Sequence, residues 1–349
     1  MWFKVIYVFF TAVCLCTASA YSQSEKLIFA IDVFRHGDRT PIIDLPSTPY
    51  SWPQGLGQLT PIGMQQEFQL GVAMRKRYVT MNALLPSTYN VTTMYVGSTD
   101  YNRTLMSAQS LLAGLYPLGT GPNIPHTDKP ALPAAAQPVP IHILPAFFVL
   151  VADPNKHNAI LEKYVFSQPD WQEKSKELQP HFARWSQLTG IKITYLDDLL
   201  LIGDALYIRK LYNLPLPANM TQDEAEMIIQ ASSWAFITMF KEPEIGYIGG
   251  HEILVNVAKS LQKASTEHDG LKVRLYAAHD STILSLASAM HAPLDQIPPY
   301  ASDLNFALLQ VEQGDYVVKV TLNQKPLIIP ACGGSVCTLS QFITDVALM

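Results

Sequence analysis

The sequence has little charge, few cysteines and no long apolar run beyond its first twenty residues. Charged residues make up 15% of the 349 residues, whereas apolar residues make up 48%. This composition, with 16 Tyr and 14 Phe, is typical of a compact globular enzyme and argues against a disordered chain. The formal net charge of -5 leaves no basic surplus to neutralise a nucleic-acid backbone, so no nucleic-acid partner is expected.

The N-terminus has the pattern of an export signal over residues 1–20. Lys4 gives a positive start, an apolar run follows from Val5 to Thr17, and Ala18-Ser19-Ala20 offers a small-x-small cleavage site. The run is too short to span a bilayer comfortably, which disfavours the alternative of an uncleaved anchor. We therefore expect an exported chain without a membrane partner after cleavage: periplasmic or secreted, or lysosomal or extracellular in a eukaryotic host.

Only two of the four cysteines lie beyond this leader. Cys332 and Cys337 bracket a stretch with two glycines that lets the chain close a small ring. In an oxidising compartment this spacing favours a local disulfide, and the alternative is a pair of free thiols. A zinc site would need two more ligands, and no His cluster lies nearby in the sequence. No HExxH or comparable pattern occurs, so no metal and no other cofactor is expected.

Apolar patterning predicts an α/β fold interrupted by helices. Short runs rich in β-branched and aromatic residues predict strands at 27–34, 92–97, 273–278, 305–311 and 316–322. Helical spacing predicts helices at 60–78, 98–115, 171–188, 195–212, 221–240 and 281–291. Residues 117–145 contain eight prolines and mark a boundary. We expect a discontinuous α/β domain (21–130 and 235–349) and a helical cap (131–234).

The segment Phe34 to Pro41 directly follows the first predicted strand. Ligands of open α/β sheets bind beyond the carboxyl ends of strands, so this is a suitable place for a site. Arg35 and Arg39 flank His36, and guanidinium groups match phosphate oxygens bidentately. The pattern therefore suggests an anion trap around a nucleophile, although on its own it also fits an exposed basic turn.

Two further segments place polar side chains just beyond predicted strands. Arg103 lies near a helix start that follows the second strand, and helix N-termini favour anions. The pair His279-Asp280 follows the strand at 273–278 and begins a helix, where Asp280 can also act as a cap. A second pair, His268-Asp269, precedes a strand and fits an ordinary turn. The alternatives are a surface arginine and a purely capping aspartate.

These residues resemble the signature of the histidine acid phosphatases, a branch of the phosphoglycerate-mutase-like superfamily. The motif Arg-His-Gly-x-Arg-x-Pro matches at Arg35, His36, Gly37, Arg39 and Pro41. Further similarity covers nearly all of the mature chain, at residues 57–78, Arg103, His279-Asp280 and 299–302. The resemblance implies a sheet core flanked by helices, with a smaller and mostly helical cap. The two cysteines of the mature chain are fewer than animal members usually carry, which suggests bacterial secreted or periplasmic members.

The resemblance also implies a mechanism. His36 is expected to attack phosphorus and form a phosphohistidine, and Asp280 is expected to protonate the leaving alcohol. The phosphate oxygens are expected to be held by Arg35, Arg39, Arg103 and His279. The arginines should keep the pKa of His36 below its usual value of ~6.5, and Asp280 should start protonated, so an acidic optimum is expected.

Several alternatives remain open at this stage. A phytase shares these motifs, whereas the leader and the His-Asp pair disfavour an intracellular mutase. A non-catalytic phosphate-ester binding protein is disfavoured because His36 and Asp280 are both present. The loop at 42–58, with Tyr50 and Trp52, could wall the pocket or simply pack. Members of the family form dimers, but the sequence indicates no interface for a homodimer.

Overall fold

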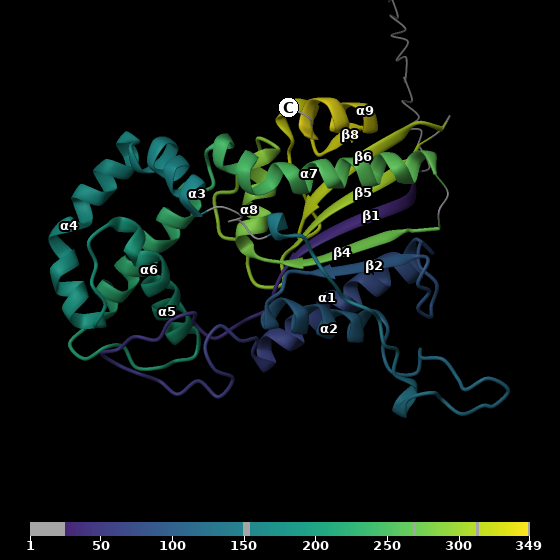
Figure 1. The fold of residues 1–349 in the computed structure, drawn as a ribbon, viewed down its shortest axis with the longest axis horizontal. Helices are drawn as coiled ribbons and strands as arrows, with labels where there is room; N and C mark the ends of the chain where they lie inside the picture. The colour runs from purple at the N-terminus through teal and green to yellow at the C-terminus, as the bar shows by residue number, and fades with distance from the viewer. Residues whose placement is uncertain (1–24, 149–153, 268–269, 312–313, 348–349) are drawn as a thin grey trace, which may run out of the picture.

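A computed structural model describes residues 25–148, 154–267, 270–311 and 314–347 of the chain (Figure 1). The predicted leader therefore lies outside the described residues. The fold is a mixed α/β sheet with helices on both faces and a helical part to one side. The strands are β1 (Lys26–Arg35), β2 (Met94–Ser98), β3 (His142–Ile143), β4 (Val273–Ala278), β5 (Asp303–Gln310), β6 (Tyr316–Leu322), β7 (Lys325–Pro326) and β8 (Val336–Thr338).

The sheet has the order β3-β2-β4-β1-β5-β6-β7, and β8 pairs with β6. The first four strands in this order run parallel, whereas β5 runs antiparallel to β1 and β6 antiparallel to β5. The carboxyl ends of β2, β4 and β1 therefore lie next to one another at one edge. The start of β5 lies at the same edge, because β5 runs in the opposite direction.

Helices cover both faces of the sheet because successive strand side chains alternate between them. On β1, Phe29, Ile31 and Val33 enter a core with α7 (Pro243–Thr266) and α8 (Asp280–Ala289). Ala30 and Phe34 enter the opposite core with α1 (Pro61–Arg75) and α2 (Asn102–Leu115). Figure 1 shows α7 on one side of the sheet and α1 and α2 on the other.

The remaining helices form a separate apolar core beside the sheet. They are α3 (Pro154–Leu161), α4 (Pro169–Thr189), α5 (Leu199–Leu211) and α6 (Gln222–Thr238). Their buried residues include Trp185, Leu206 and Ile228, all with no exposed surface. The loop after β1 contributes Leu45 to this core, which ties the helical part to the strand that precedes it.

The fold class predicted from the sequence is confirmed, and most elements lie within a few residues of their predicted positions. Thr60 caps α1 by accepting a hydrogen bond from the Gly63 amide, with Pro61 at the first helical position, as its sequence suggests. Beyond Arg75 the helix continues as a π-helical turn to Met81. The helix α7 and the elements after β6 were not delimited from the sequence. The division into a catalytic domain and a cap at 131–234 stays a prediction.

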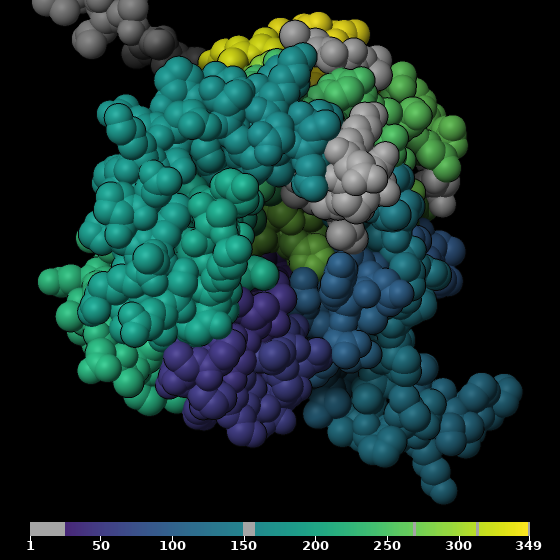
Figure 2. Space-filling model, turned by 60° about the vertical axis from the view of Figure 1, so that its left-hand side comes forward, coloured from purple at the N-terminus to yellow at the C-terminus, as the bar shows by residue number. Residues whose placement is uncertain are grey.

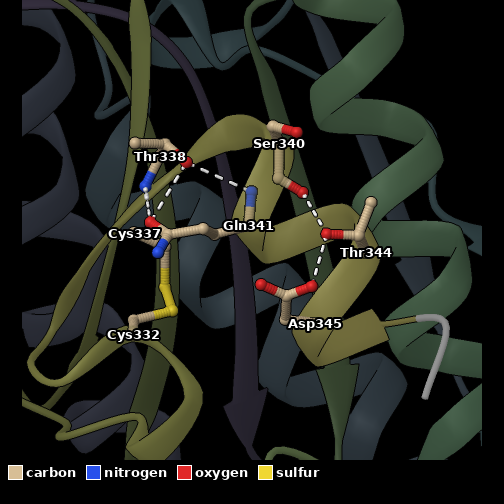
Figure 3. Close-up of a disulfide and its surroundings, with 7 residues drawn as sticks. All are labelled: Cys332, Cys337, Thr338, Ser340, Gln341, Thr344 and Asp345. Atoms are coloured by element: carbon tan, nitrogen blue, oxygen red, sulfur yellow. Dashed lines mark hydrogen bonds between the residues drawn. A yellow bond between two sulfur atoms is a disulfide. The ribbon is translucent and has the colours of Figure 1, made fainter.

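The C-terminal elements are joined by the predicted disulfide. Cys332 and Cys337 are bonded, with their Cα atoms 5.2 Å apart (Figure 3). Cys337 lies on β8, and α9 (Leu339–Gln341) follows with a π-helical turn at Phe342–Ala347. Because β8 pairs with β6, the bond fastens this short segment against the edge of the sheet.

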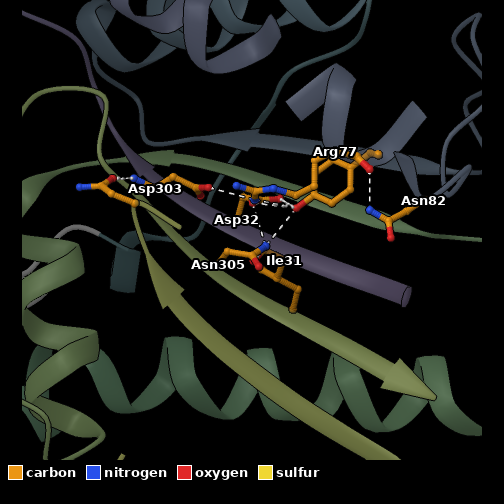
Figure 4. A network of polar contacts seen from close by, with 8 residues as sticks. Ile31, Asp32, Arg77, Asn82, Asp303 and Asn305 are labelled. Atoms are coloured by element: carbon orange, nitrogen blue, oxygen red, sulfur yellow. Dashed lines mark hydrogen bonds and ion pairs between the residues drawn. The ribbon is translucent and has the colours of Figure 1, made fainter. Parts of the chain in front are cut away.

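A buried polar network lies on the α1 side of the sheet (Figure 4). Asp32, in the middle of β1, accepts hydrogen bonds from Tyr78, Arg77 and Asn305. Arg77 also contacts Asp303, at 3.2 Å. Near it, Glu67 of α1 is fully buried, and neither of its carboxyl oxygens has a partner among the described residues. Arg77 thus contacts two buried carboxyl groups, and the third, Glu67, lies near Asp303.

This network predicts a contribution to the stability of the fold that is larger in acid than at neutral pH. Burial raises the pKa of Glu67, Asp303 and Asp32, so the folded chain keeps protons that the unfolded chain releases above its ordinary pKa values. Their contribution is full below those ordinary values and is lost as pH rises, with a slope of about 1.4 kcal/mol per pH unit for each proton. Urea unfolding from pH 5 to 8 should show this decline.

The matched test replaces Glu67 by glutamine, which cannot ionise. Glu67→Gln should make the decline in unfolding free energy between pH 5 and 8 shallower. Glu173→Gln, on the exposed surface of α4, is the control and should leave the decline unchanged. A Glu67→Gln protein with the wild-type slope would contradict the assignment.

Candidate active site

The three segments singled out in the sequence meet at the carboxyl ends of adjacent parallel strands. His36 follows β1, Thr99 follows β2, and His279 follows β4. Backbone hydrogen bonds fix the segments to one another: the His36 amide donates to the Ala278 carbonyl, and the Thr99 amide donates to the Ala277 carbonyl. Each segment therefore lies just beyond the end of a strand, as the sequence predicts.

The arginines of the motif are buried and paired with carboxylates. Arg35 contacts Asp280 at 2.7 Å. Arg39 forms a two-pronged pair with Asp204 of α5, at 2.9 and 3.1 Å. Burial would lower the pKa of Arg39, but Asp204 outweighs burial and the pKa lies above its ordinary value. The Arg39 guanidinium therefore stays charged in this low-dielectric site.

A third arginine completes the site from α2. Arg103 lies on the first turn of this helix, with its Nη2 3.5 Å from Nδ1 of His279. Burial, together with the charge of Arg39, lowers the pKa of Arg103. Within the described part of the chain, the buried Nε atoms of Arg35, Arg39 and Arg103 have no hydrogen-bond acceptor. Unpaired buried donors on three arginines are the pattern that an anionic ligand would satisfy.

His36 is held as a neutral ring. Its Nδ1 lies 2.8 Å from the Gly37 carbonyl, which can only accept, so Nδ1 carries the proton and the lone pair is on Nε2. Burial, then Arg35, Arg39 and Arg103, lower the pKa of His36 well below its ordinary value. The side chain is 2% exposed. The sequence predicted this direction from the arginines alone, whereas burial is the larger cause.

Glycine beside His36 is required by close packing. A Cβ atom on Gly37 would lie 2.4 Å from the Gly63 carbonyl oxygen at the start of α1. The Gly37 amide donates to Ser107 of α2. The loop that carries His36 is thus pressed against the first turn of α1 and fastened to α2, which fixes the imidazole relative to Arg103.

His279 and Asp280 lie beside this histidine. The rings of His36 and His279 have centroids 5.6 Å apart. Burial and Arg103 lower the pKa of His279 to about 4, and its Nε2 contacts the Thr99 hydroxyl at 3.0 Å. Burial alone would raise the pKa of Asp280, but Arg35 and Arg39 outweigh it, and the pKa lies below its ordinary value. In the free protein this lowered pKa favours the ionised form of Asp280, and the expected role of Asp280 as proton donor stays a prediction.

These residues line a cavity of about 1090 Å³ between the sheet and the helical part. Figure 2 shows a hollow between the teal helical residues and the blue α1–α2 side, with the purple loop after β1 below it. The loop at 42–58 contributes Ile42 to the lining, whereas Trp52 is 8% exposed and packs on Tyr212 and Tyr50. Trp52 and Tyr50 thus pack rather than wall the cavity.

Sequence reasoning missed two residues that shape the site. Asp204 pairs with Arg39, and the ring of Tyr300 lies 4.2 Å from the Arg35 guanidinium carbon. Asp204 is a single acid within the apolar run LLLIGDAL, which was a usable signal. Tyr300 belongs to the segment 299–302 that was noted only for its resemblance. The pair His268-Asp269 lies outside the described residues.

A buried neutral histidine among three arginines, beside a carboxylate, defines a site suited to phosphoryl transfer. A family model described as "Histidine phosphatase superfamily (branch 2)" matches residues 26–323. The chain therefore belongs to the histidine phosphatase superfamily, branch 2. Membership predicted from the motif is thus confirmed.

Named relatives agree with this family. The lysosomal acid phosphatase of Bos taurus is 30% identical, covering 92% of this chain and 78% of the relative. The prostatic acid phosphatase of Homo sapiens is 31% identical, covering 91% and 84%. Among solved structures, a Klebsiella sp. ASR1 phytase has a TM-score of 0.68 at 16% identity, covering 93% and 96%. A Hafnia alvei phytase with tartrate has a TM-score of 0.66 at 18% identity, covering 92% and 97%. At 16% and 18% identity, the similarity to the two phytase structures shows a shared fold and nothing more.

Among the described residues, no helix is long and apolar enough to cross a membrane. No group of three or more His, Cys, Asp or Glu side chains in that part of the chain is placed to hold a metal ion.

Proposed function

We propose that this enzyme, a histidine acid phosphatase by class, hydrolyses phosphate monoesters through a covalent intermediate on His36. The observation that carries this proposal is the neutral tautomer of His36, with its Nε2 lone pair free beside three arginines. A nucleophile of this kind needs little more than positioning and stabilisation of the phosphate charge. The class also fits the acid phosphatase names of the sequence relatives.

In the first step Nε2 of His36 attacks phosphorus while the bond from phosphorus to the ester oxygen breaks. The phosphate oxygens replace carboxylates as partners of Arg35 and Arg39 and fill the unpaired donors of Arg103. The leaving ester oxygen, on which negative charge develops, accepts a proton from Asp280. In the second step water gives a proton back to Asp280 and attacks phosphorus, the bond to Nε2 breaks, and inorganic phosphate leaves.

The proton on Asp280 has to arrive with the substrate. In the free protein Arg35 keeps the pKa of Asp280 low. A phosphate group on Arg35 would bring negative charge beside that carboxylate and weaken the attraction, and both changes raise the pKa of Asp280. The proton comes from solvent or from a singly ionised ester, and the concentration of both sources increases as the pH falls. An acidic optimum therefore follows from proton uptake on binding.

We expect hydrolysis of 4-nitrophenyl phosphate to be fastest at about pH 4 to 6, and kcat/KM to fall above neutral pH. The acid limb should lie well below pH ~6.5, because burial and the arginines hold the pKa of His36 well below its ordinary value. Steady-state rates between pH 3 and 9 measure both limbs. Activity that peaks above pH 7 would contradict the proton-donor role of Asp280.

We also propose that the chain is exported through residues 1–20. The Cys332–Cys337 disulfide fits an oxidising compartment, and relatives are named lysosomal. Export to a periplasm, to the cell exterior or to a lysosome would each suit an enzyme with an acidic optimum.

A further inference from the structure

Building on the proposed function, we propose that the preferred substrates are phosphate monoesters with an extended apolar substituent, such as a long alkyl chain. Beyond the phosphate site, the described lining of the cavity is mainly apolar and contains no further arginine or lysine. Substrates with several phosphate groups should therefore be poor.

One wall of the cavity is a stripe along α5. Leu200, Asp204, Tyr207 and Leu211 recur at helical spacing and all line the cavity. Asp204 is the only charged member of this stripe, and it lies against Arg39 in the phosphate site. The stripe therefore presents apolar surface to any group that extends from the phosphate along α5.

The α6 helix continues this wall. Ile229, Phe236 and Ile237 line the cavity at the same kind of spacing, with Ser232 and Ser233 between them. Gly203 of α5 lies against Ser232, where a Cβ atom would meet the serine side chain at 2.2 Å. The two helices are thus in close contact, and their cavity-facing sides form one continuous wall.

The rim of the cavity is apolar and open to solvent. Ile62 is 51% exposed, Leu211 is 47%, and Ile42 and Leu201 are each 42%, and all four line the cavity. Large apolar side chains gathered around a cavity mouth and left in water are a mark of a ligand site. They would be covered when an apolar substituent lies in the cavity.

The charges of the cavity fit a single phosphate group. Among the described lining residues the cations are Arg35, Arg39 and Arg103, and none is a lysine. The lining carboxylates are Asp38, Asp197, Asp204 and Asp280. A second phosphate on the same substrate would thus meet apolar or uncharged polar side chains, or Asp197, rather than a cation. An ester of a densely phosphorylated polyol would therefore bury unpaired negative charge.

The cavity is also large enough for such a substituent. Its volume of about 1090 Å³ lies at the upper end of the range for sites that enclose drug-sized ligands. One phosphate group would fill only a small part of it.

The test is the specificity of the full chain for monoalkyl phosphates from ethyl to decyl, used below the concentrations at which they aggregate. We expect kcat/KM to rise by about two- to fourfold per methylene group until the chain extends past the rim. Phytate should be a poorer substrate than octyl phosphate. A kcat/KM that is flat or falls with chain length, or that is highest for phytate, would overturn the inference.

Two lysine substitutions locate the effect. Leu201→Lys puts a cation on the rim and should lower the octyl-to-ethyl ratio of kcat/KM by about tenfold. Met227→Lys, on α6 but outside the lining and 39% exposed, is the matched control and should leave the ratio unchanged. Equal ratios in the wild type and both variants would place the apolar contact elsewhere and overturn the assignment.

Failure of the underlying function looks different. If 4-nitrophenyl phosphate is not hydrolysed, and the wild type matches His36→Ala, the phosphatase itself is refuted. If that ester is hydrolysed but chain length has no effect, only the substrate class is refuted.

Discussion

Replacing His36 by alanine should lower kcat for phosphate monoesters by about 10⁴-fold or more. In the proposed mechanism the imidazole of His36 bonds to phosphorus, and His279 is the other histidine in the described lining of the cavity. His279 is close, but its Nε2 contacts Thr99 and its Nδ1 faces Arg103. Because kcat is the turnover rate of the enzyme–substrate complex, the loss should appear even at saturating ester. Steady-state kinetics on 4-nitrophenyl phosphate measure it directly.

The control for this substitution is His181→Ala. His181 is exposed on α4 and stacks on Trp185 away from the cavity lining, so its loss should leave kcat unchanged. Phosphate attached to the wild-type protein after rapid quenching in alkali should be absent from His36→Ala. A His36→Ala protein that is folded and keeps more than about a hundredth of wild-type kcat would refute the nucleophile assignment.

Replacing Asp280 by asparagine should slow esters in proportion to how poorly their alcohols leave. A general acid contributes on the order of 10²- to 10⁴-fold where the leaving oxygen needs a proton, so alkyl phosphates should suffer that loss. Nitrophenolate leaves without a proton, so 4-nitrophenyl phosphate should lose much less. Values of kcat/KM over a series of leaving groups give this dependence as a slope.

The comparison variant is Asp204→Asn, which loosens Arg39 but has no part in the proposed protonation of the leaving group. It should slow alkyl and nitrophenyl esters by a similar factor. If Asp280→Asn also affects both esters equally, Asp280 acts only through Arg35 and the proton-donor role fails.

The part of the site that the sequence predicted rests on one rule about parallel strands. His36, Arg103 and His279 each follow a strand pattern, and carboxyl ends of adjacent parallel strands share an edge. The helix caps were also readable, because Thr60-Pro61 is a local signal. Local patterns thus placed the residues near strand ends, although they did not specify that β4 lies between β1 and β2.

What the sequence left out depends on contacts between distant segments. Asp204 meets Arg39 only because α5 packs beside the loop after β1. The same holds for Glu67 and Asp303, whose proximity has no local signature in the sequence. The single acid in the apolar run of β1, Asp32, is the one local hint of the buried polar network. The ionised state of Asp280 is likewise set by Arg35, a partner 245 residues away in sequence (280 − 35).

The carboxylates paired with the arginines make substrate binding an exchange of partners. In the free enzyme Asp280 and Asp204 are already paired with Arg35 and Arg39. An incoming phosphate therefore has to displace these carboxylates and does not meet unpaired arginines. The net gain is therefore smaller than the same arginines would give if they stood alone. Inorganic phosphate has no apolar substituent to strengthen its binding, and it competes with the same two carboxylates when the reaction ends. If these arginines hold the phosphate as proposed, Asp280 and Asp204 compete with the product for them, which would favour release of the product and the next turnover.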